Sequence, residues 1–425
     1  MSSTGKDKYT VKNYPQALNT LIKSAPKIFD LTNESHLDKV ITASEIILAL
    51  FDTRADLDTL EKELIAVKDD IPILIHLAVK LAISKRIIIN LKGTIHISVV
   101  FAVYKENNRI KTKAEHEHGE NFLIRKITQL EWLFNGCPNF SWDLIIVDGG
   151  CPKNSGKIAQ EILTANNVGH NVQVLFIEDA IKQRLPVTAP MTSIAESQKG
   201  GAIEYGMWVA AQQEKPNHII LFTDADLSTH LGQTGLLLEG IVNQDQEAAI
   251  GSRRGKTAVV GKPTYRYRRA KLFSYLRGQL TPNINHIEDT QCGFKAFKAD
   301  IVRAVICDMI DKRFAFDIEL LLKTELIRKN SIAQVPIVWI DSEAASTITD
   351  QQPYLTMLKS VAKMYRKYLP QNPESDTFAQ FIDSLNEAMW LRLIDNVPPA
   401  IVERGLAEFD NHNRVKVVNL EAALA

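Results

Sequence analysis

The sequence lacks a net charge, a long apolar run and a cysteine framework. Its 50 Lys and Arg residues equal its 50 Asp and Glu residues, so the charge does not indicate nucleic acid as a partner. The longest apolar stretch, residues 71–83, is interrupted by Pro72, His76 and Lys80 and is shorter than the roughly 18 uncharged residues of a membrane-spanning helix. We therefore expect no transmembrane span.

Further absences exclude other classes of protein. The four cysteines show neither C-x-x-C nor zinc-ligand spacing, which is typical of reduced structural thiols. The N-terminal residues carry charge without the apolar core of a secretory signal. No G-x-G-x-x-G or G-x-x-x-x-G-K-S/T pattern opens a helical segment, so neither a dinucleotide cofactor nor a Walker-type phosphate site is favoured. These features predict a cytoplasmic protein, with a peripheral position on a membrane left open.

The apolar pattern divides the chain into three regions. Apolar residues recur at helical spacing from about residue 31 to 89, with a polar break at Asp52 and Thr53, which predicts a small helical module over residues 1–92. From Ile95, continuous apolar runs alternate with helical segments, which predicts an α/β domain over 93–346 whose mostly parallel sheet is covered by helices on both faces. Residues 347–425 read as a C-terminal helical extension.

Acidic side chains follow several of the predicted strands. The apolar run that begins at His218 ends in Asp224 and Asp226, and other runs are followed by Glu106 and by Asp148. In an open parallel sheet, ligands bind beyond the carboxyl ends of the strands. Two carboxylates one residue apart at such an end are suited to hold a hard divalent cation against a diphosphate, whereas the others can accept hydrogen bonds from a nucleobase or a ribose.

Eight motifs in residues 95–346 together resemble a known family. In order along the chain they are VVFAVYKENNRI, LIIVDGG, QKGGAIEYGM, ILFTDADLS, GSRR, DTQCGFKAF, FAFDIELL and VPIVW. Their order and approximate spacing resemble the family 2 inverting glycosyltransferases, most closely the branch of dolichyl-phosphate glucosyltransferase and dolichyl-phosphate mannose synthase. The resemblance implies a glycosyltransferase A (GT-A) fold and a UDP- or GDP-sugar as donor.

The resemblance also implies roles for particular residues. Carried over position by position, it implies donor binding by Tyr104, Glu106, Asp148, Lys199, Asp224 and Asp226. Asp226, with Asp224, is expected to hold Mn²⁺ or Mg²⁺, which stabilises the charge that grows on the leaving diphosphate. The segment Lys199–Gly201 can instead be only a helix start that permits close packing.

The acceptor decides which other residues are needed. A hydroxyl acceptor must lose a proton, and Asp317 is the candidate base, followed by Glu319 and Asp289, although Asp317 can equally cap or salt-bridge its helix. A lipid phosphate is already ionised and needs cations instead. The sequence offers five arginines, which can also be no more than a solvated face: Arg253, Arg254, Arg266, Arg268 and Arg269.

Departures from the family pattern affect both substrates. Ala102 stands where the family usually has proline and Lys105 where it often has asparagine, which leaves the detail of nucleoside recognition open. Glu204 stands where the lipid-phosphate enzymes often have arginine, which weakens the case for a lipid-phosphate acceptor. The polar segment EHEHGE at residues 115–120 is expected to be a charged loop rather than a metal site.

We therefore predict a metal-dependent, inverting glycosyltransferase that moves a hexose from a nucleotide-diphosphate sugar to an acceptor, with a polyprenyl phosphate as one candidate. A soluble saccharide, small-molecule or protein hydroxyl is the alternative acceptor, and a non-catalytic nucleotide-sugar binding protein is the alternative of another class. The segment AKLFSYLRGQL fits either a membrane surface or a helix packed on the sheet. The helical ends are candidates for a homodimer interface, for shaping the acceptor site or for docking on a partner.

Overall fold

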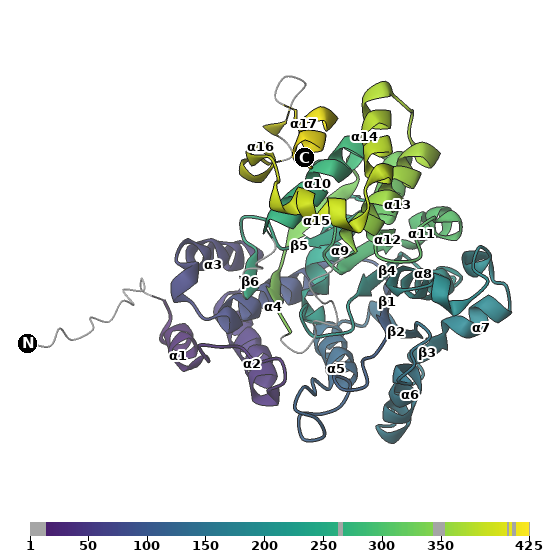
Figure 1. The fold of residues 1–425 in the computed structure, drawn as a ribbon. Helices are drawn as coiled ribbons and strands as arrows, with labels where there is room; N and C mark the ends of the chain where they lie inside the picture. Colours follow the sequence, from purple (N-terminus) through teal and green to yellow (C-terminus); the bar gives the residue numbers. More distant parts are fainter. Residues whose placement is uncertain (1–13, 262–266, 343–352, 406–407, 410–413, 425) are drawn as a thin grey trace, which may run out of the picture.

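The computed structural model of the protein describes residues 14–261, 267–342, 353–405, 408–409 and 414–424. Within them, seven strands form a central sheet in the order β3-β2-β1-β4-β7-β5-β8, and β7 runs antiparallel to both of its neighbours (Figure 1). The strands of this sheet are β1 (Ile95–Val103), β2 (Phe140–Asp148), β3 (Val172–Phe176), β4 (His218–Thr223), β5 (Ala248–Ser252), β7 (Phe294–Lys298) and β8 (Ile332–Pro336). A second, two-stranded parallel sheet pairs β6 (Val259–Gly261) with β9 (Val338–Ile340).

The register of the parallel strands brings the acidic strand ends to one edge. Val103 at the end of β1 lies beside Asp148 at the end of β2, and Val100 lies beside Phe222 of β4. Successive side chains of β1 alternate between two cores: Val100 packs on one side of the sheet, whereas Val99 and Phe101 pack on the other. Both faces are therefore covered, as predicted for a buried parallel sheet.

Helices that follow the strands cover these two faces. One face carries α5 and α9, and the other carries α8, α11 and α12. The bounds in this region are α5 (Phe122–Phe134), α6 (Ser155–Ala165), α7 (Ile177–Lys182), α8 (Lys199–Ala211), α9 (Thr234–Val242), α10 (Tyr267–Leu280), α11 (Ala299–Val305) and α12 (Phe316–Ile327).

The N-terminal helices add to the face that α5 and α9 cover. They are α1 (Gln16–Ser24), α2 (Glu34–Leu50), α3 (Arg54–Ala66) and α4 (Ile73–Asn90). The predicted break at Thr53 is the start of α3, where the Thr53 hydroxyl and the Asp56 carboxylate form a capping box. Helix α4 is buried on nearly every side and contacts α9, so the described part of this region, residues 14–92, shares one hydrophobic core with the sheet.

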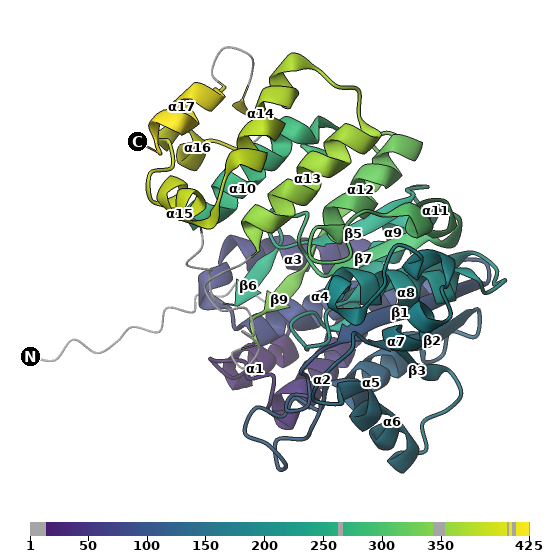
Figure 2. The same cartoon turned by 45° about the vertical axis from the view of Figure 1, so that its right-hand side comes forward.

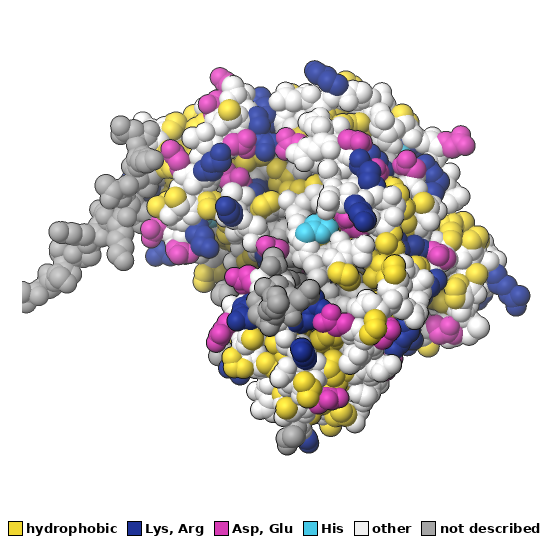
Figure 3. Space-filling model, turned by 90° about the horizontal axis from the view of Figure 1, so that it is seen from above, with side chains coloured by type: hydrophobic (Ala, Val, Ile, Leu, Met, Phe, Trp, Pro, Cys, Tyr) yellow, Lys and Arg dark blue, Asp and Glu magenta, His cyan; other side chains and the backbone are white. Residues whose placement is uncertain are grey.

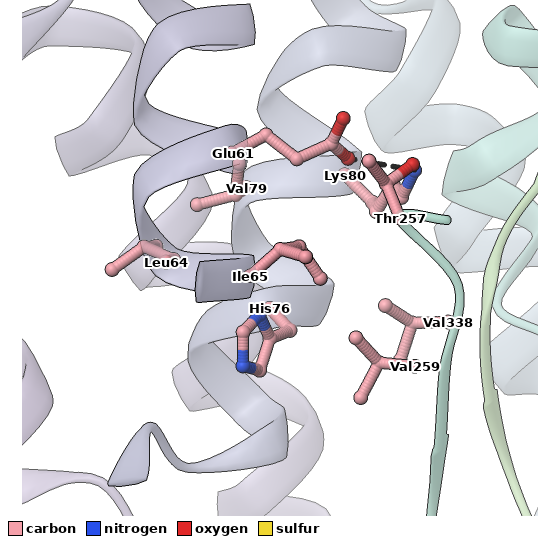
Figure 4. Close-up of a pocket in the computed structure, with 9 residues that line it drawn as sticks. All are labelled: Glu61, Leu64, Ile65, His76, Val79, Lys80, Thr257, Val259 and Val338. Carbon is pink, nitrogen blue, oxygen red and sulfur yellow. Dashed lines mark hydrogen bonds and ion pairs between the residues drawn. The ribbon is translucent and has the colours of Figure 1, made fainter. Parts of the chain in front are cut away.

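A small recess marks where α3 and α4 meet the second sheet (Figure 4). In it Lys80 forms an ion pair with Glu61 at 2.6 Å and donates to the Thr257 hydroxyl at 3.1 Å. Thr257 follows the GSRR motif, so the N-terminal helices directly hold the segment that carries the predicted phosphate-binding arginines.

The C-terminal helices pack on the other side of the molecule, around α10 (Figure 2). They are α13 (Tyr354–Tyr368), α14 (Pro373–Ser384), α15 (Glu387–Asp395), α16 (Pro399–Glu403) and α17 (Val417–Ala422). Helix α10 contains the AKLFSYLRGQL segment. Its Leu272, Leu276 and Leu280 are fully buried, and even Arg277 is 1% exposed. The packed-helix reading of this segment is therefore correct, and its apolar side is not free to rest on a membrane.

The surface agrees with the balanced composition. On the face that Figure 3 shows, acidic and basic side chains are interspersed with scattered apolar ones. None of the helices in the described ranges combines the length and the apolar content that crossing a bilayer requires.

Candidate active site

The DAD segment follows β4 directly and packs against Gly293 of the DTQCGFK motif. The Asp224 amide donates to the Gly293 carbonyl at 3.1 Å. A Cβ atom at position 293 would lie 2.3 Å from an Asp224 carboxylate oxygen, so only glycine allows this close approach. The DTQCGFK motif begins at Asp289, 65 residues (289 − 224) after Asp224. The two motifs are therefore distant in sequence but form one structure at the edge of the sheet.

Both DAD carboxylates pair with a cation while keeping contact with solvent. Asp224 forms an ion pair with Lys199, and Asp226 accepts from Arg109 at 3.1 Å; the exposed fractions of the two aspartate side chains are 35% and 16%. Burial opposes ionisation of Asp224, but the Lys199 ammonium outweighs it and lowers the pKa of the carboxyl. The predicted donor residues Lys199, Asp224 and Asp226 thus lie together.

Arg109 was not among the predicted site residues. Its guanidinium donates to both carboxylate oxygens of Glu106, at 2.7 and 2.8 Å, and its remaining nitrogen reaches Asp226. Burial raises the pKa of Glu106, although Arg109 opposes the shift. The i,i+3 spacing of Glu106 and Arg109 in KENNRI was the available signal for this pair, and it ties the end of β1 to the DAD segment.

A buried cation lies beneath the DAD segment. Lys126 of α5 is fully buried, its ammonium has no hydrogen-bond partner among the described residues, and it lies 5.7 Å from the centre of the Phe101 ring. Burial lowers its pKa to about 8, against the pull of Asp226 and the other nearby carboxylates. No sequence signal separates this lysine from an ordinary surface residue of a helix, so sequence analysis missed it.

Glu120, the last residue of EHEHGE, is also buried at the site. Its carboxylate accepts from the Leu227 amide at 3.2 Å and from the Ser342 hydroxyl, and so joins the DAD segment to the end of β9. The other residues of EHEHGE form the predicted loop, in which His116 is partly buried and His118 is exposed. The described residues hold no group of three or more His, Cys, Asp or Glu side chains arranged for a metal ion.

The loops after β1 and β2 form the predicted nucleoside side. Asp148 accepts from the amides of Gly150, Cys151 and Gly156 at 2.6–2.9 Å, so it holds the loop as well as facing the site edge. Tyr104 is half-exposed beside it. Lys105 has a φ of 61°, a left-handed conformation that asparagine adopts more readily, which explains the residue usual at this position in the family.

The described arginines of the predicted set lie on two elements: Arg253 and Arg254 follow β5, whereas Arg268 and Arg269 lie on α10. Arg253 makes two side-chain bonds to Asp289, both 2.8 Å, and its guanidinium lies 5.4 Å from the Trp339 ring centre. These bonds lower the pKa of Asp289 even though burial opposes the shift. The Arg254 amide donates to Ser252, Arg268 is exposed, and Arg269 is partly covered; Arg266 lies outside the described residues.

The three acids proposed as bases occupy different surroundings. Asp317 pairs with Lys295 at 2.6 Å, with side chains 5% and 0% exposed, and burial raises the pKa of Asp317 against the effect of Lys295 and Lys199. Glu319 accepts from the amides of Ile310 and Asp311 and is fully buried. Asp289 is held by Arg253. Their role as bases stays a prediction.

The hydrogen bonds at the start of α8 support the prediction that its glycines permit close packing. The amides of Gly200 and Gly201 donate to the carbonyls of Arg313 and Lys312, at 2.7 and 2.8 Å, so these amides are occupied within the fold. Only the Lys199 side chain reaches the DAD segment. Glu204 of the same helix is fully buried against Lys312, and burial raises its pKa to about 8.

Comparison with known proteins agrees with this geometry. The dolichyl-phosphate beta-glucosyltransferase of Drosophila melanogaster is 25% identical over 283 residues, which cover 65% of this chain and 76% of that protein. The undecaprenyl-phosphate mannosyltransferase of Micrococcus luteus is 33% identical over 137 residues, which cover 31% of this chain and 52% of that protein. These relatives bear out the resemblance to the dolichyl-phosphate glucosyltransferase branch of the family 2 glycosyltransferases that the motifs indicated.

No family model matches this glycosyltransferase. Among solved structures, glucosyl-3-phosphoglycerate synthase from Mycobacterium tuberculosis in complex with UDP aligns with a TM-score of 0.43 and 14% identity, over 69% of this chain and 86% of that one. The predicted α/β architecture, a mostly parallel sheet covered by helices on both faces, is confirmed by the strand order and by the two cores on either side of the sheet.

Proposed function

We propose that this glycosyltransferase transfers a hexose from a UDP- or GDP-sugar to a polyprenyl phosphate, with inversion at the anomeric carbon and with Mn²⁺ or Mg²⁺ as cofactor. The observation that carries the proposal is the pair of partly exposed carboxylates, Asp224 and Asp226, flanked by Lys199 and Arg109 at the carboxyl edge of the sheet. The names of the relatives, which act on dolichyl or undecaprenyl phosphate, supply the acceptor.

The carboxylates fit a divalent ion that is shared with the donor. Mg²⁺ and Mn²⁺ take oxygen ligands, and in phosphoryl sites Mg²⁺ is usually held by one or two carboxylates together with substrate phosphates and water. Asp226 has one oxygen bonded to Arg109 and the other to the Ser228 amide, so each oxygen keeps a free lone pair. A bound divalent ion would supply Lewis-acid stabilisation to the leaving diphosphate.

The chain's own residues supply the remaining tasks. Lys199 and Arg109 place positive charge beside the DAD carboxylates, where a donor diphosphate brings negative charge. Asp148 and Glu106 fix the loops that follow β1 and β2, so the nucleoside side keeps its shape. A lipid phosphate acts as its own nucleophile, so this reaction needs no protein base, and the buried position of Asp317 is compatible with that requirement.

The departure at Glu204 does not count against a lipid-phosphate acceptor. The Glu204 side chain is fully buried and paired with Lys312, so it is closed off from solvent and from a bound acceptor. Burial also raises the pKa of Glu204 to about 8, so this side chain places little negative charge near a substrate phosphate. We therefore keep a lipid phosphate as the proposed acceptor.

A substrate panel tests the proposal. Purified protein is incubated with UDP-glucose, GDP-mannose and other nucleotide sugars, with Mn²⁺, Mg²⁺ or EDTA, and with either a polyprenyl phosphate or soluble hydroxyl acceptors. We expect a glycolipid product that depends on the metal and has the anomeric configuration opposite to the donor's. Products formed only on soluble hydroxyls would replace the acceptor in the proposal, and nucleotide binding without any turnover would favour a binding protein.

A further inference from the structure

The C-terminal helices lie far from the DAD segment in sequence, yet a continuous set of hydrogen bonds joins them to it. We propose that Tyr368 of α13 is a positioning residue that, through Glu319 and the loop 310–313, fixes the start of α8 and thereby places Lys199 beside Asp224. The inference rests on the proposed function in one respect, since it takes Lys199 and Asp224 to be donor-binding residues.

The first step joins α13 to α12. The Tyr368 hydroxyl donates to Glu319 at 2.7 Å, and the ammonium groups of Lys323 and Lys367 lie 5.4 and 4.9 Å from the centre of the Tyr368 ring. The ring is therefore held by two cations in addition to the bond of its hydroxyl. Glu319 is fully buried, so its bond to Tyr368 is shielded from competing water.

The second step joins α12 to the loop 310–313. Glu319 accepts from the amides of Ile310 and Asp311, at 2.6 and 2.8 Å, with one carboxylate oxygen each. Asp311 in turn accepts from the amides of Arg313 and Ala315, at 2.8 and 2.9 Å, which closes the turn. Both carboxylates thus hold backbone amides of this loop, and the path of the loop depends on both.

The third step joins the loop to α8. The first amides of a helix have no partner within the helix, and here the loop carbonyls supply it. The Lys312 carbonyl accepts from Gln198 and Gly201, and the Arg313 carbonyl accepts from Gly200, all at 2.7–2.9 Å. A Cβ atom on Gly200 would lie 2.8 Å from the Arg313 carbonyl oxygen, so the contact leaves no room for a displaced loop.

The last step reaches the DAD segment. Lys199 is the first residue of α8, and its ammonium pairs with Asp224. The Lys312 side chain pairs with Glu204 one turn further along α8 and donates to the Val187 carbonyl at 3.2 Å. A loop that loses its support at Glu319 would therefore let the first turn of α8 move, and Lys199 would move with it.

Helix α13 offers a matched control for the test. Tyr365 is 1% exposed, and its hydroxyl bonds Asp376 at 2.9 Å and the backbone of Asn372, both outside the set that reaches α8. Tyr365→Phe and Tyr368→Phe each remove one hydroxyl from a tyrosine of the same helix. They differ in whether Glu319 loses a partner.

The experiment compares both variants with wild type in the full-length protein. Hydrogen exchange of the amides of residues 198–201 reports on the loop–α8 bonds, and titration with UDP and GDP in the presence of Mn²⁺, followed by steady-state kinetics, reports on the donor site. We expect Tyr368→Phe to speed exchange at 198–201 and to raise KM for the nucleotide sugar, each by about 3- to 10-fold, with kcat nearly unchanged. Tyr365→Phe should change neither, even where both variants lose the same thermal stability.

The two readouts separate the two hypotheses. Exchange at 198–201 that is unchanged in Tyr368→Phe, or that rises equally in Tyr365→Phe, would overturn the inference whatever the nucleotide does. An increase confined to Tyr368→Phe without any rise in KM would overturn the link to donor binding. A wild-type protein that binds neither UDP nor GDP overturns the proposed function, while the exchange result still decides whether Tyr368 holds α8.

Discussion

The acids after β4 and the acids at the start of α12 look equivalent in sequence, yet they differ in their access to solvent. Asp224 and Asp226 pair with cations but keep 35% and 16% of their side chains exposed. Asp317 is 5% exposed and Glu319 is fully buried, and both are bonded to groups of the fold. A carboxylate of the first kind can exchange its partner for a ligand, whereas one of the second kind is bound to the fold, Asp317 through the Lys295 ammonium and Glu319 through backbone amides.

The largest effect is expected at the enclosed pair. Asp317→Asn leaves the Lys295 ammonium buried without a counter-charge, and breaking a buried pair in this way costs about 3–5 kcal/mol in the free energy of unfolding. Urea denaturation measures it. The double variant Asp317→Leu/Lys295→Met should recover most of the loss, because no unpaired charge remains. A stable Asp317→Asn protein that loses activity with hydroxyl acceptors alone would instead establish Asp317 as a base and break the comparison.

The exposed pair should show the opposite pattern. Asp226→Asn is expected to lower kcat/KM by about 10²- to 10³-fold, because stabilisation of the leaving diphosphate is lost, with little change in unfolding. Asp245→Asn is the control, since Asp245 also pairs with cations, Lys298 and Arg328, on an exposed surface. Loss of stability in Asp226→Asn equal to that in Asp317→Asn would show that both acids serve the fold.

The buried histidine His230, next to the DAD segment, provides a test of the comparison through the pH dependence of unfolding. His230 is 5% exposed and accepts from the Gly232 amide, and burial, followed by the charge of Lys126, lowers its pKa to about 3. The unfolded chain binds a proton at about pH 6.5, so between pH 6.5 and 3 the unfolded state holds more protons and acid destabilises the fold. On going from pH 7 to pH 5, the lowered pKa of His230 should reduce the free energy of unfolding by about 2 kcal/mol.

The control for that prediction is His230→Asn, whose side-chain oxygen can still accept from Gly232. Unfolding curves of wild type and variant are measured at both pH values. The difference in stability between the two proteins should shrink by the stated amount on going to pH 5. Parallel pH profiles would mean that the pKa of His230 does not differ between the folded and the unfolded protein, and would contradict the prediction.

The smallest effect is expected at Asp289, which is enclosed while its partner Arg253 is 30% exposed. Arg253→Lys keeps the charge but loses one of two parallel hydrogen bonds, which should cost about 1 kcal/mol of stability. Arg268→Lys on the exposed side of α10 serves as the control and should be neutral. Thermal unfolding of the two variants distinguishes them, and an equal shift in both would remove any special role for the Arg253–Asp289 pair.

Sequence analysis predicted the sheet and the DAD edge because apolar strand runs and acidic strand ends are local patterns. It also grouped Lys199 with Asp224 correctly. It missed Lys126, since a buried lysine on a helix has the same sequence signature as a solvated one. It could not tell that Asp317 would be enclosed by Lys295, because their pairing depends on how β7 packs against α12 rather than on spacing along the chain.

The contact between Gly293 and Asp224 has a consequence for any attempt to change this protein's specificity. A methyl group at position 293 would lie 2.3 Å from the Asp224 carboxylate, so Asp224 would have to leave its place beside Lys199. A library that randomises the DTQCGFK region should return glycine there in every active clone. A change in sugar preference would then have to come from substitutions at the residues around Gly293.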